Sequence, residues 1–500
     1  MTLIEWMPFS VLIPLIAAPI CALLPGRWLP WLLALVSVAA SAIICAFMLP
    51  AALQQGVLSY AFGNWPPPIG IEYRVDVVNA LLALLISAMA VIILPWARTS
   101  VNQEVPERQG PFYALFLLAM SGLMGITLTG DVFNVFVFLE ISSLSTYALI
   151  AHGRNRAALL ASFRYLIMGT LGATFYLIGV GFLYIQTGTL NMTDLADRLP
   201  ALADDRAIRT AFGFIIVGMG LKLALFPLHR WLPGAYANAP SMVTVFLAAT
   251  ATKVAVYVLL RLVFSVFGVE FALAMPFKEI FLTLGAVGIF FASISAIKQT
   301  SLKRMLAYSS VSQIGYIALA ISLISTAGLA AGLVHIFNHA LMKGALFMCV
   351  GAIVYRIGSD RLADIGGLAK QMPLTMLAFV LAGLSMIGVP LTAGFISKWA
   401  LISAAIEACN GYAVAIVLIG SLMAVIYIWR VVEIAYLQPA PENADLSQRR
   451  EVGLHMLIPL WILIAANIYF GIDTSLTLDV ATIGAEVLMG GTEAVTGSTP

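Results

Sequence analysis

Seven ionisable residues stand inside long apolar stretches of the chain, where a charged group is expensive to keep. They are Glu140, Lys222, Lys253, His335, His339, Lys343 and Lys398. On an insertion scale, a charged side chain at the centre of a bilayer costs about 2.5–3.5 kcal/mol. Ionisable residues at such positions default to a functional interpretation. Lysine, glutamate and histidine in one membrane region are suited to accepting and donating protons, so these seven are the candidate site.

Glu140 is the one acidic residue deep in an apolar stretch, about 13 Å into its expected helix at 1.5 Å per residue. Ser143 and Tyr147 follow on the same helical face and are expected to give the carboxylate hydroxyl partners. A carboxylate beside a buried lysine holds the lysine protonated, and moving either charge releases the proton. A static salt bridge that only fixes helix packing is the other interpretation. It is weaker for four lysines, because one carboxylate cannot neutralise four.

His335, His339 and Lys343 are spaced four residues apart, which places them on one face of one helix. Imidazole titrates nearest physiological pH, so the stripe is interpreted as a proton relay. Asn338 and Ser312 are expected to support it, and a satisfied polar cluster is the competing interpretation. A metal site is disfavoured, because no third ligand is near and the lysine repels a cation. We expect neither a metal nor another cofactor.

The elements that hold these residues must be membrane helices. Of the 500 residues, 61% are hydrophobic and 10% are charged, against roughly 25% charged in soluble proteins. So few charges cannot coat a water-soluble body of this size. Apolar runs between charged or Gly/Pro breaks predict about 14 transmembrane helices. The expected spans are 8–25, 29–50, 75–97, 111–129, 131–151, 158–186, 209–228, 240–263, 276–297, 305–325, 328–354, 373–408, 411–436 and 453–472.

An internal repeat and two prolines refine this fold. Three short strings recur in the same order: S-L-S-T-Y at 143–147 and S-Q-I-G-Y at 312–316, F-R-Y-L-I-M at 163–168 and F-N-H-A-L-M at 337–342, F-P-L at 226–228 and V-P-L at 389–391. Pro227 and Pro390 each interrupt an apolar span, and matched broken helices are typical of transport proteins. We predict an all-α polytopic membrane protein with two inverted five-helix repeats, about 111–263 and 276–436, and two broken helices. Residues 1–110 form N-terminal transmembrane helices, and 437–500 form the last transmembrane helix and a short tail.

The charge distribution predicts orientation and excludes several functions. With the N-terminus outside, the expected cytoplasmic loops carry 16 of the 26 lysines and arginines and the outer loops carry six. Fourteen spans then return the C-terminus outside. A net charge of +2 without a cluster of basic residues disfavours nucleic-acid binding. The four cysteines stand singly, which excludes a cysteine-held redox centre in this chain, and no GxxxxGKS loop binds ATP.

Several strings resemble a known family, the antiporter-like subunits shared by respiratory complex I, membrane-bound hydrogenases and Mrp-type multisubunit cation/proton antiporters. The resemblance covers about residues 110–430. Within the family the chain most resembles the D subunits of Mrp antiporters, and complex I subunits L, M and N are related. The strings that carry it are Gly130-Asp131-Val132-Phe133-Asn134 through Glu140, Gly220-Leu221-Lys222, Phe226-Pro227-Leu228-His229-Arg230-Trp231, Ala237-Asn238-Ala239-Pro240-Ser241, Leu306-Ala307-Tyr308-Ser309-Ser310, His335 to Lys343, and Pro390 to Lys398.

The resemblance implies roles and partners. Glu140 pairs with Lys222, Lys253 is central and Lys398 serves proton exit. The first hypothesis is a proton-translocating subunit of a multisubunit Na⁺/H⁺ antiporter in the bacterial inner membrane, a secondary transporter and not an enzyme. The second is a proton-pumping subunit of NADH:quinone oxidoreductase or a membrane-bound hydrogenase, and the third is a scaffold that conducts nothing. The expected partners are other subunits of the complex, the lipid bilayer, protons, and Na⁺ either in this chain or in a partner.

Overall fold

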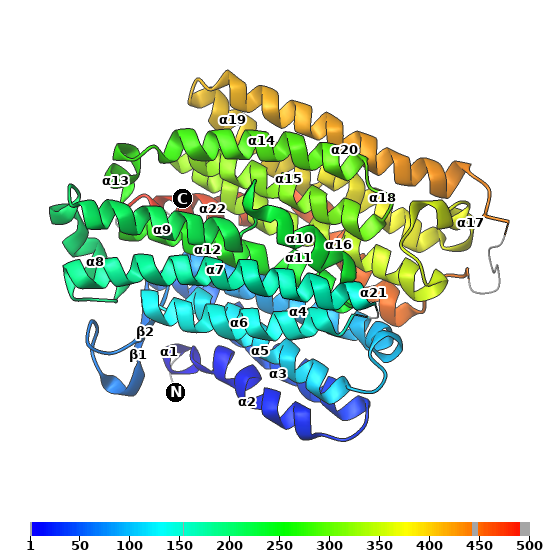
Figure 1. Cartoon of the computed structure of the whole chain (residues 1–500), viewed down its shortest axis with the longest axis horizontal. Helices are drawn as coiled ribbons and strands as arrows, with labels where there is room; N and C mark the ends of the chain where they lie inside the picture. The colour runs from blue at the N-terminus through cyan, green and yellow to red at the C-terminus, as the bar shows by residue number, and fades with distance from the viewer. Residues whose placement is uncertain (1–2, 154, 443–448, 491–500) are drawn as a thin grey trace.

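The structure, a computed structural model, describes residues 3–153, 155–442 and 449–490. Long helices run side by side along the longest axis of the molecule (Figure 1). In the described part of the chain, twelve helices are long and apolar enough to cross a membrane. The expected all-α polytopic membrane protein is therefore confirmed. The inverted symmetry of the two five-helix sets stays a prediction.

The helices that meet this criterion follow the expected spans closely. The first is made of α1 (Leu3–Trp6) and α2 (Phe9–Leu23) together. The others are α3 (Trp28–Gln55), α4 (Val77–Glu104), α5 (Gln109–Leu128), α6 (Val132–Ala151), α7 (Arg156–Thr187), the composite Ser241–Val266, α14 (Phe277–Ile297), α15 (Leu302–Ser322), α16 (Thr326–Ile357), α20 (Gly411–Leu437) and α21 (Leu454–Ile472).

The two spans that carry Pro227 and Pro390 are interrupted, as expected. In the first, α9 (Arg206–Lys222) ends five residues before the proline, and the chain resumes with η3 (Leu228–Arg230) and α10 (Trp231–Asn238). Trp231 donates its indole N–H to the Leu221 carbonyl at 2.9 Å, which satisfies a carbonyl freed at the end of α9. In the second, α18 (Pro373–Ile387) ends at Gly388 in the left-handed region, φ +92°, and α19 (Ala393–Glu407) follows.

Two further features of the fold were not predicted, an interrupted span and an additional helix. The span expected at 240–263 breaks at Thr250 into α11 (Ser241–Ala249) and α12 (Ala251–Leu260), and then winds into a π-helix, η4 (Arg261–Val266). After α21 the chain forms α22 (Ser475–Leu488), which packs against α16 and α4. The expected short tail is therefore in part a packed helix. Residues 443–448 and 491–500 of the last segment lie outside the described residues.

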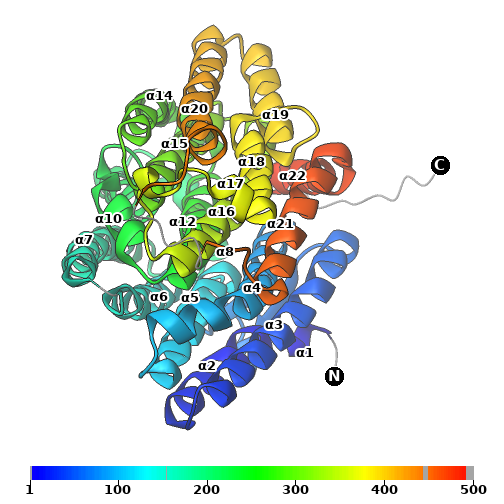
Figure 2. The same cartoon turned by 90° about the vertical axis from the view of Figure 1, so that its right-hand side faces the viewer.

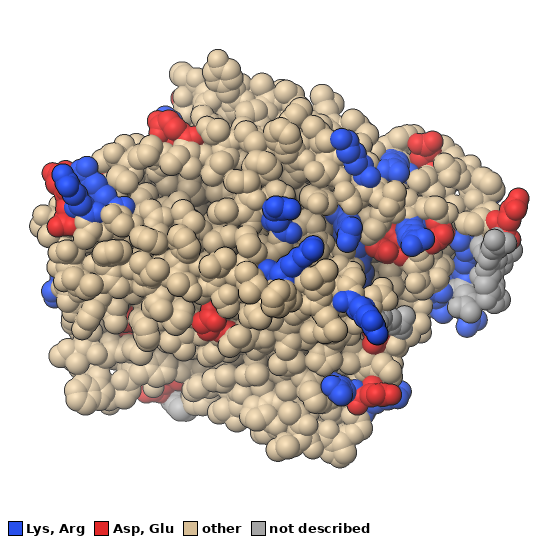
Figure 3. All heavy atoms as spheres, in the orientation of Figure 1, with Lys and Arg blue, Asp and Glu red and all other residues tan. Residues whose placement is uncertain are grey.

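Most of the remaining elements lie at one end of the bundle, here named the α8 end. They are the antiparallel strands β1 (Leu58–Ala61) and β2 (Glu72–Val75), the short helices α8 (Met192–Arg198) and α13 (Val269–Ala274), and the 3₁₀ turns η1 (Phe62–Asn64) and η2 (Leu199–Leu202). The opposite end has η5 (Leu362–Asp364) and α17 (Leu368–Gln371). On the face drawn in Figure 3, most lysines and arginines gather toward this opposite end. Seen end-on, α16 lies in the middle of the bundle (Figure 2).

Candidate functional site

Glu140 and Lys222 form an ion pair, as the sequence predicts. Lys222 is the last residue of α9, and its Nζ lies 4.0 Å from Glu140 Oε1 on α6. Ser143 lies closer: its hydroxyl accepts a hydrogen bond from Lys222 at 2.8 Å. The expectation that Ser143 and Tyr147 would serve the carboxylate is therefore wrong. Among the described residues no hydrogen bond joins Ser143 to Glu140, and neither Glu140 Oε1 nor the Tyr147 hydroxyl has a hydrogen-bond partner.

Glu140 lies toward the outer surface of the bundle. Its side chain is 26% exposed, against 5% for the Lys222 side chain. Its neighbours on that face of α6 are the exposed apolar residues Phe133, Val137 and Leu144. Glu140 is the acidic residue within α6. A carboxylate that faces outward at this depth requires a polar partner.

Lys253 is buried beside the break between α11 and α12. Its side chain is 1% exposed, and Nζ donates a short hydrogen bond to the Ala248 carbonyl. Ala248 lies in the last turn of α11, where carbonyls lack a partner within the helix. The break at Thr250 thus supplies the acceptor that the buried ammonium needs. The ammonium also lies within electrostatic range of His339 and Lys343 on α16.

The three residues of the stripe are aligned on α16 and fully buried. The His335 and His339 rings are nearly parallel, with centroids 5.9 Å apart and planes 10° apart. His335 Nδ1 lies 2.9 Å from the Ser397 hydroxyl, at the start of α19. Lys343 Nζ donates to the Leu306 carbonyl at 2.9 Å and, over a shorter distance, to the Ser309 hydroxyl on α15.

The histidines keep three ring nitrogens without a protein partner. These are His335 Nε2 and both nitrogens of His339, which make no hydrogen bond to the residues that the structure describes. Asn338 does not support them, because its amide donates to the Ala393 carbonyl at the helix break. Buried polar atoms of this kind take ordered water as their partner. The stripe is therefore suited to a hydrated path.

Lys398 lies at the second broken helix and has three acceptors. Its Nζ donates to the Met386 and Ile387 carbonyls, both at 2.9 Å, and to the Ser421 hydroxyl at 3.0 Å. The two carbonyls belong to the last turn of α18, so the ammonium caps a negative helix end. It also lies 4.8 Å from the centroid of the Tyr316 ring, a cation–π contact.

Five of the seven predicted residues therefore gather in one cluster, and the remaining two form a separate pair. Ser397 adjoins Lys398, and Met386 contacts both Lys398 and, through its sulfur at 3.4 Å, Lys343. In the described part of the chain, no contact joins Lys222 to Lys253. Ser397, Ser421 and Tyr316 were not among the predicted site residues. The repeated string that ends in Tyr147 and Tyr316 was a signal for the tyrosine.

Comparison with known proteins identifies the family of this helical site. The sequence model described as NADH:quinone oxidoreductase/Mrp antiporter, TM, matches residues 129–424, which hold all seven site residues. The chain belongs to this family of antiporter-like, proton-translocating membrane subunits.

Particular relatives point to two kinds of complex. The chain is 44% identical over 466 residues to NADH-quinone oxidoreductase subunit N of Desulforudis audaxviator (strain MP104C), covering 91% of this chain and 93% of the relative. It is similar to a chain of the Mrp complex from Dietzia sp. DQ12-45-1b, with a TM-score of 0.91, 26% identity and 98% of each chain covered. It also resembles a chain of an archaeal membrane-bound sulfane sulfur reductase, with a TM-score of 0.89, 30% identity and 97% of each chain covered. All three are subunits or chains of multisubunit assemblies.

Proposed function

We propose that this chain carries protons across the membrane through Glu140, Lys222, Lys253, His335, His339, Lys343 and Lys398. The observation that carries the proposal is the buried cluster on α12, α16 and α19. Its lysines donate to acceptors at two helix breaks, Met386 contacts both Lys343 and Lys398, and His335 contacts Ser397. A merely structural core would satisfy these polar groups with fixed partners. Here three buried imidazole nitrogens have no hydrogen-bond partner among the described residues, so water is their expected partner.

The Glu140–Lys222 pair is the input step of this mechanism. At 4.0 Å and an effective dielectric constant of about 20, the pair attraction is about 4 kcal/mol before screening. This attraction favours the protonated lysine while Glu140 is ionised. When a positive charge outside the chain attracts the Glu140 carboxylate, the carboxylate stabilises the Lys222 ammonium less, and the lysine releases its proton. Ser143 keeps the amino group in place during the change.

The cluster around α16 is the transfer step. Lys253, Lys343 and Lys398 repel one another when all are protonated, because they carry like charges and Glu140, the one acidic residue deep in an apolar span, pairs with Lys222. A proton that arrives at one end of the row therefore favours release at the other. The histidines and their water bridge the distance between the lysines, and Ser397 links His335 to the segment that holds Lys398.

The chain is proposed to work within a complex whose other subunits supply the driving reaction. Glu140 faces outward at membrane depth, so a neighbouring subunit with a polar or cationic group completes its surroundings. The 44% identity over nearly the whole chain favours a redox-driven complex, in which partners carry the electrons. A Na⁺/H⁺ antiporter, the system expected from the sequence, is the second candidate and is supported by the TM-score of 0.91. On the face drawn in Figure 3, lysines and arginines gather toward the end of the bundle opposite the α8 end, which supports a cytoplasmic location for that end. Both termini are then expected outside a bacterial inner membrane.

Purification of the intact complex through a tag on this chain tests the proposal. The copurified subunits are identified, and the complex is sealed into liposomes that report internal pH. Proton movement driven by an electron donor and quinone would assign the redox system, and movement driven by a Na⁺ gradient would assign the antiporter. If neither the redox reaction nor the Na⁺ gradient moves protons in the intact complex, the proposed function is contradicted.

A further inference from the structure

A pocket of about 350 Å³, lined in part by Arg74, Asp76 and Arg261, opens at the α8 end of the bundle, away from the cluster around α16. Its rim includes Thr193 and Gly490, which are exposed, and its floor includes Asp76 and Tyr257, which are 5% and 4% exposed. A water molecule occupies roughly 30 Å³ in the liquid, so the pocket has room for several waters. The pocket therefore gives water access from the surface to the buried Tyr257.

Two residues of the pocket continue a line that starts at Lys253. Lys253, Tyr257 and Arg261 are spaced four residues apart, so they lie on one face of α12 and the first turn of η4. Tyr257 lies one turn, about 6 Å, beyond Lys253 along the helix axis. Its hydroxyl accepts from Arg261 Nε at 3.4 Å and keeps its own proton to donate. π-Helical turns are often found at functional sites, and this one begins at Arg261.

The charged wall of the pocket is held rigidly. Arg261 pairs with Asp76 at 2.6 Å, and its other terminal nitrogen donates to the Ser265 hydroxyl at 3.3 Å. Asp76 is also the N-cap of α4, where its carboxylate accepts from the Val78 N–H at 2.9 Å. The pair therefore joins α4 to η4 and is fixed at both partners. Asp76 neutralises Arg261, so Arg74 supplies the remaining positive charge of the pocket lining.

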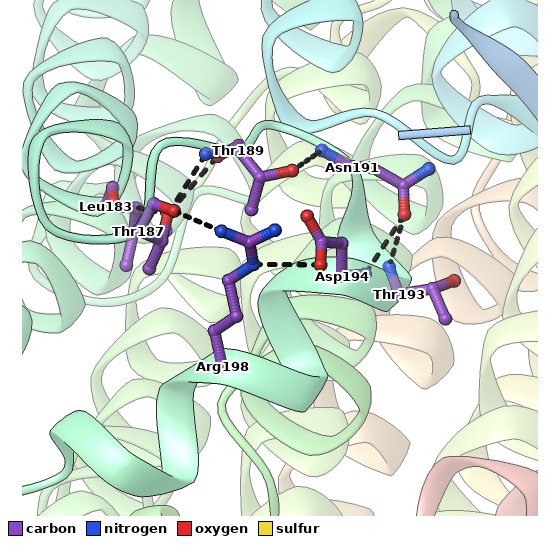
Figure 4. A network of polar contacts seen from close by, with 7 residues as sticks. All are labelled: Leu183, Thr187, Thr189, Asn191, Thr193, Asp194 and Arg198. Atoms are coloured by element: carbon purple, nitrogen blue, oxygen red, sulfur yellow. Dashed lines mark hydrogen bonds and ion pairs between the residues drawn. The ribbon is translucent and has the colours of Figure 1, made fainter. Parts of the chain in front are cut away.

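The opposite wall is α8, which a separate network holds in place (Figure 4). Arg198 donates to Asp194 at 2.8 Å and to the Thr187 carbonyl at 2.8 Å. Its hydrogen bond holds the pKa of the half-buried Asp194 carboxyl below its usual range. Asn191 caps α8, and its amide donates to the buried Glu72 at 2.9 Å. Fixed walls on both sides keep the pocket open.

We propose that this pocket is a water-filled half-channel that connects Lys253 directly to the aqueous phase at the α8 end, through the Tyr257 hydroxyl. The Lys253 ammonium now points toward Ala248, within the bundle. Rotation of its flexible stem would turn the ammonium toward Tyr257. There an N–H bond of Lys253 breaks, water in the pocket gains the proton by way of the tyrosine hydroxyl, and the neutral amine turns back to accept another. Asp76 and Arg261 act as positioning residues that hold the pocket wall.

The inference rests on the proposed function, and a cysteine experiment separates the two. Cys409, the exposed cysteine among the described residues, is first replaced by serine, since the other three are buried. Ser265→Cys then places a thiol in the pocket wall. Ala201→Cys in η2, exposed at the same end but outside the pocket, is the matched control. The intact complex is treated with membrane-impermeant thiol reagents of similar size, one cationic (MTSET) and one anionic (MTSES).

Each labelled complex is compared with the same complex before labelling, so effects of the substitution on folding cancel. A positive adduct on the order of 10 Å from the route should slow proton movement about tenfold at an effective dielectric constant of about 20. The anionic adduct should slow it less than about threefold, and neither reagent should act on the Ala201→Cys control. A thiol at 265 that does not react, or two adducts with equal effects, would overturn the half-channel. Absence of proton movement in the unlabelled wild-type complex would instead refute the proposed function.

Discussion

Removing the Glu140 charge tests the input step, and the structure gives the size of the expected effect. At 4.0 Å the pair attraction is about 4 kcal/mol at an effective dielectric constant of 20. Because 26% of the glutamate side chain is exposed, screening reduces this to about 2 kcal/mol. If that attraction drives the rate-limiting step, Glu140→Gln slows proton movement about 30-fold. Glutamine keeps the size and hydrogen-bonding capacity of the side chain, so the loss reports the charge.

Coupling between the two residues provides the sharper test. The rates of Glu140→Gln, Lys222→Gln and the double variant are measured in liposomes containing the intact complex. The double variant should be no slower than the slower single variant, because either change already removes the pair. Ser142→Ala is the control: Ser142 bonds the Leu139 carbonyl within α6 and should stay within about twofold of wild type. Losses that multiply in the double variant, or a nearly wild-type Glu140→Gln, would refute the reasoning.

Four further outcomes are expected. Replacing His335 and His339 together with glutamine should cut proton movement sharply at unchanged assembly; nearly wild-type activity at neutral and alkaline pH would leave the stripe as a polar cluster. Lys398→Met should stop transport and lower stability by roughly 2 kcal/mol, since two carbonyls at the end of α18 lose their donor, and an unchanged thermal midpoint would argue against that capping. Gly394→Ala should destabilise the second broken helix by about 1–3 kcal/mol, because its Cβ would meet the Ser385 carbonyl oxygen, whereas Gly411→Ala, with open space around it, should be tolerated; equal thermal midpoints would contradict this. The chain reconstituted alone should move no protons, and a robust Na⁺-driven pH change by the lone chain would contradict a need for partners.

Most of the fold could be predicted because lipid imposes length and apolarity on every span. The seven ionisable residues were found for the same reason, since each is costly in its apolar stretch. The breaks were harder to place. Pro227 signals the first one, yet α9 ends at Lys222, where Trp231 satisfies the freed carbonyl. The break at Thr250 has no proline or glycine to announce it.

Contacts between distant segments could not be predicted from spacing along one helix. Ser143 lies on the expected face of α6, but its hydroxyl accepts a hydrogen bond from Lys222, because the end of α9 packs within hydrogen-bond distance of it. Ser397, Ser421 and Tyr316 surround the second half of the site from three different helices. The packing of α22 against α16 likewise depends on tertiary contacts. The mixture of polar and apolar residues in α22 does not predict these contacts.

Proton movement by the intact complex carrying Lys253→Met is the most direct measurement. Lys253 lies at the break between α11 and α12, within range of the α16 stripe, and methionine keeps an unbranched buried side chain without a titratable group. If protons pass through the buried row, the complex should assemble with all its subunits and lose most of its driven proton movement. Undiminished proton movement in a fully assembled Lys253→Met complex would show that the protons do not take this path.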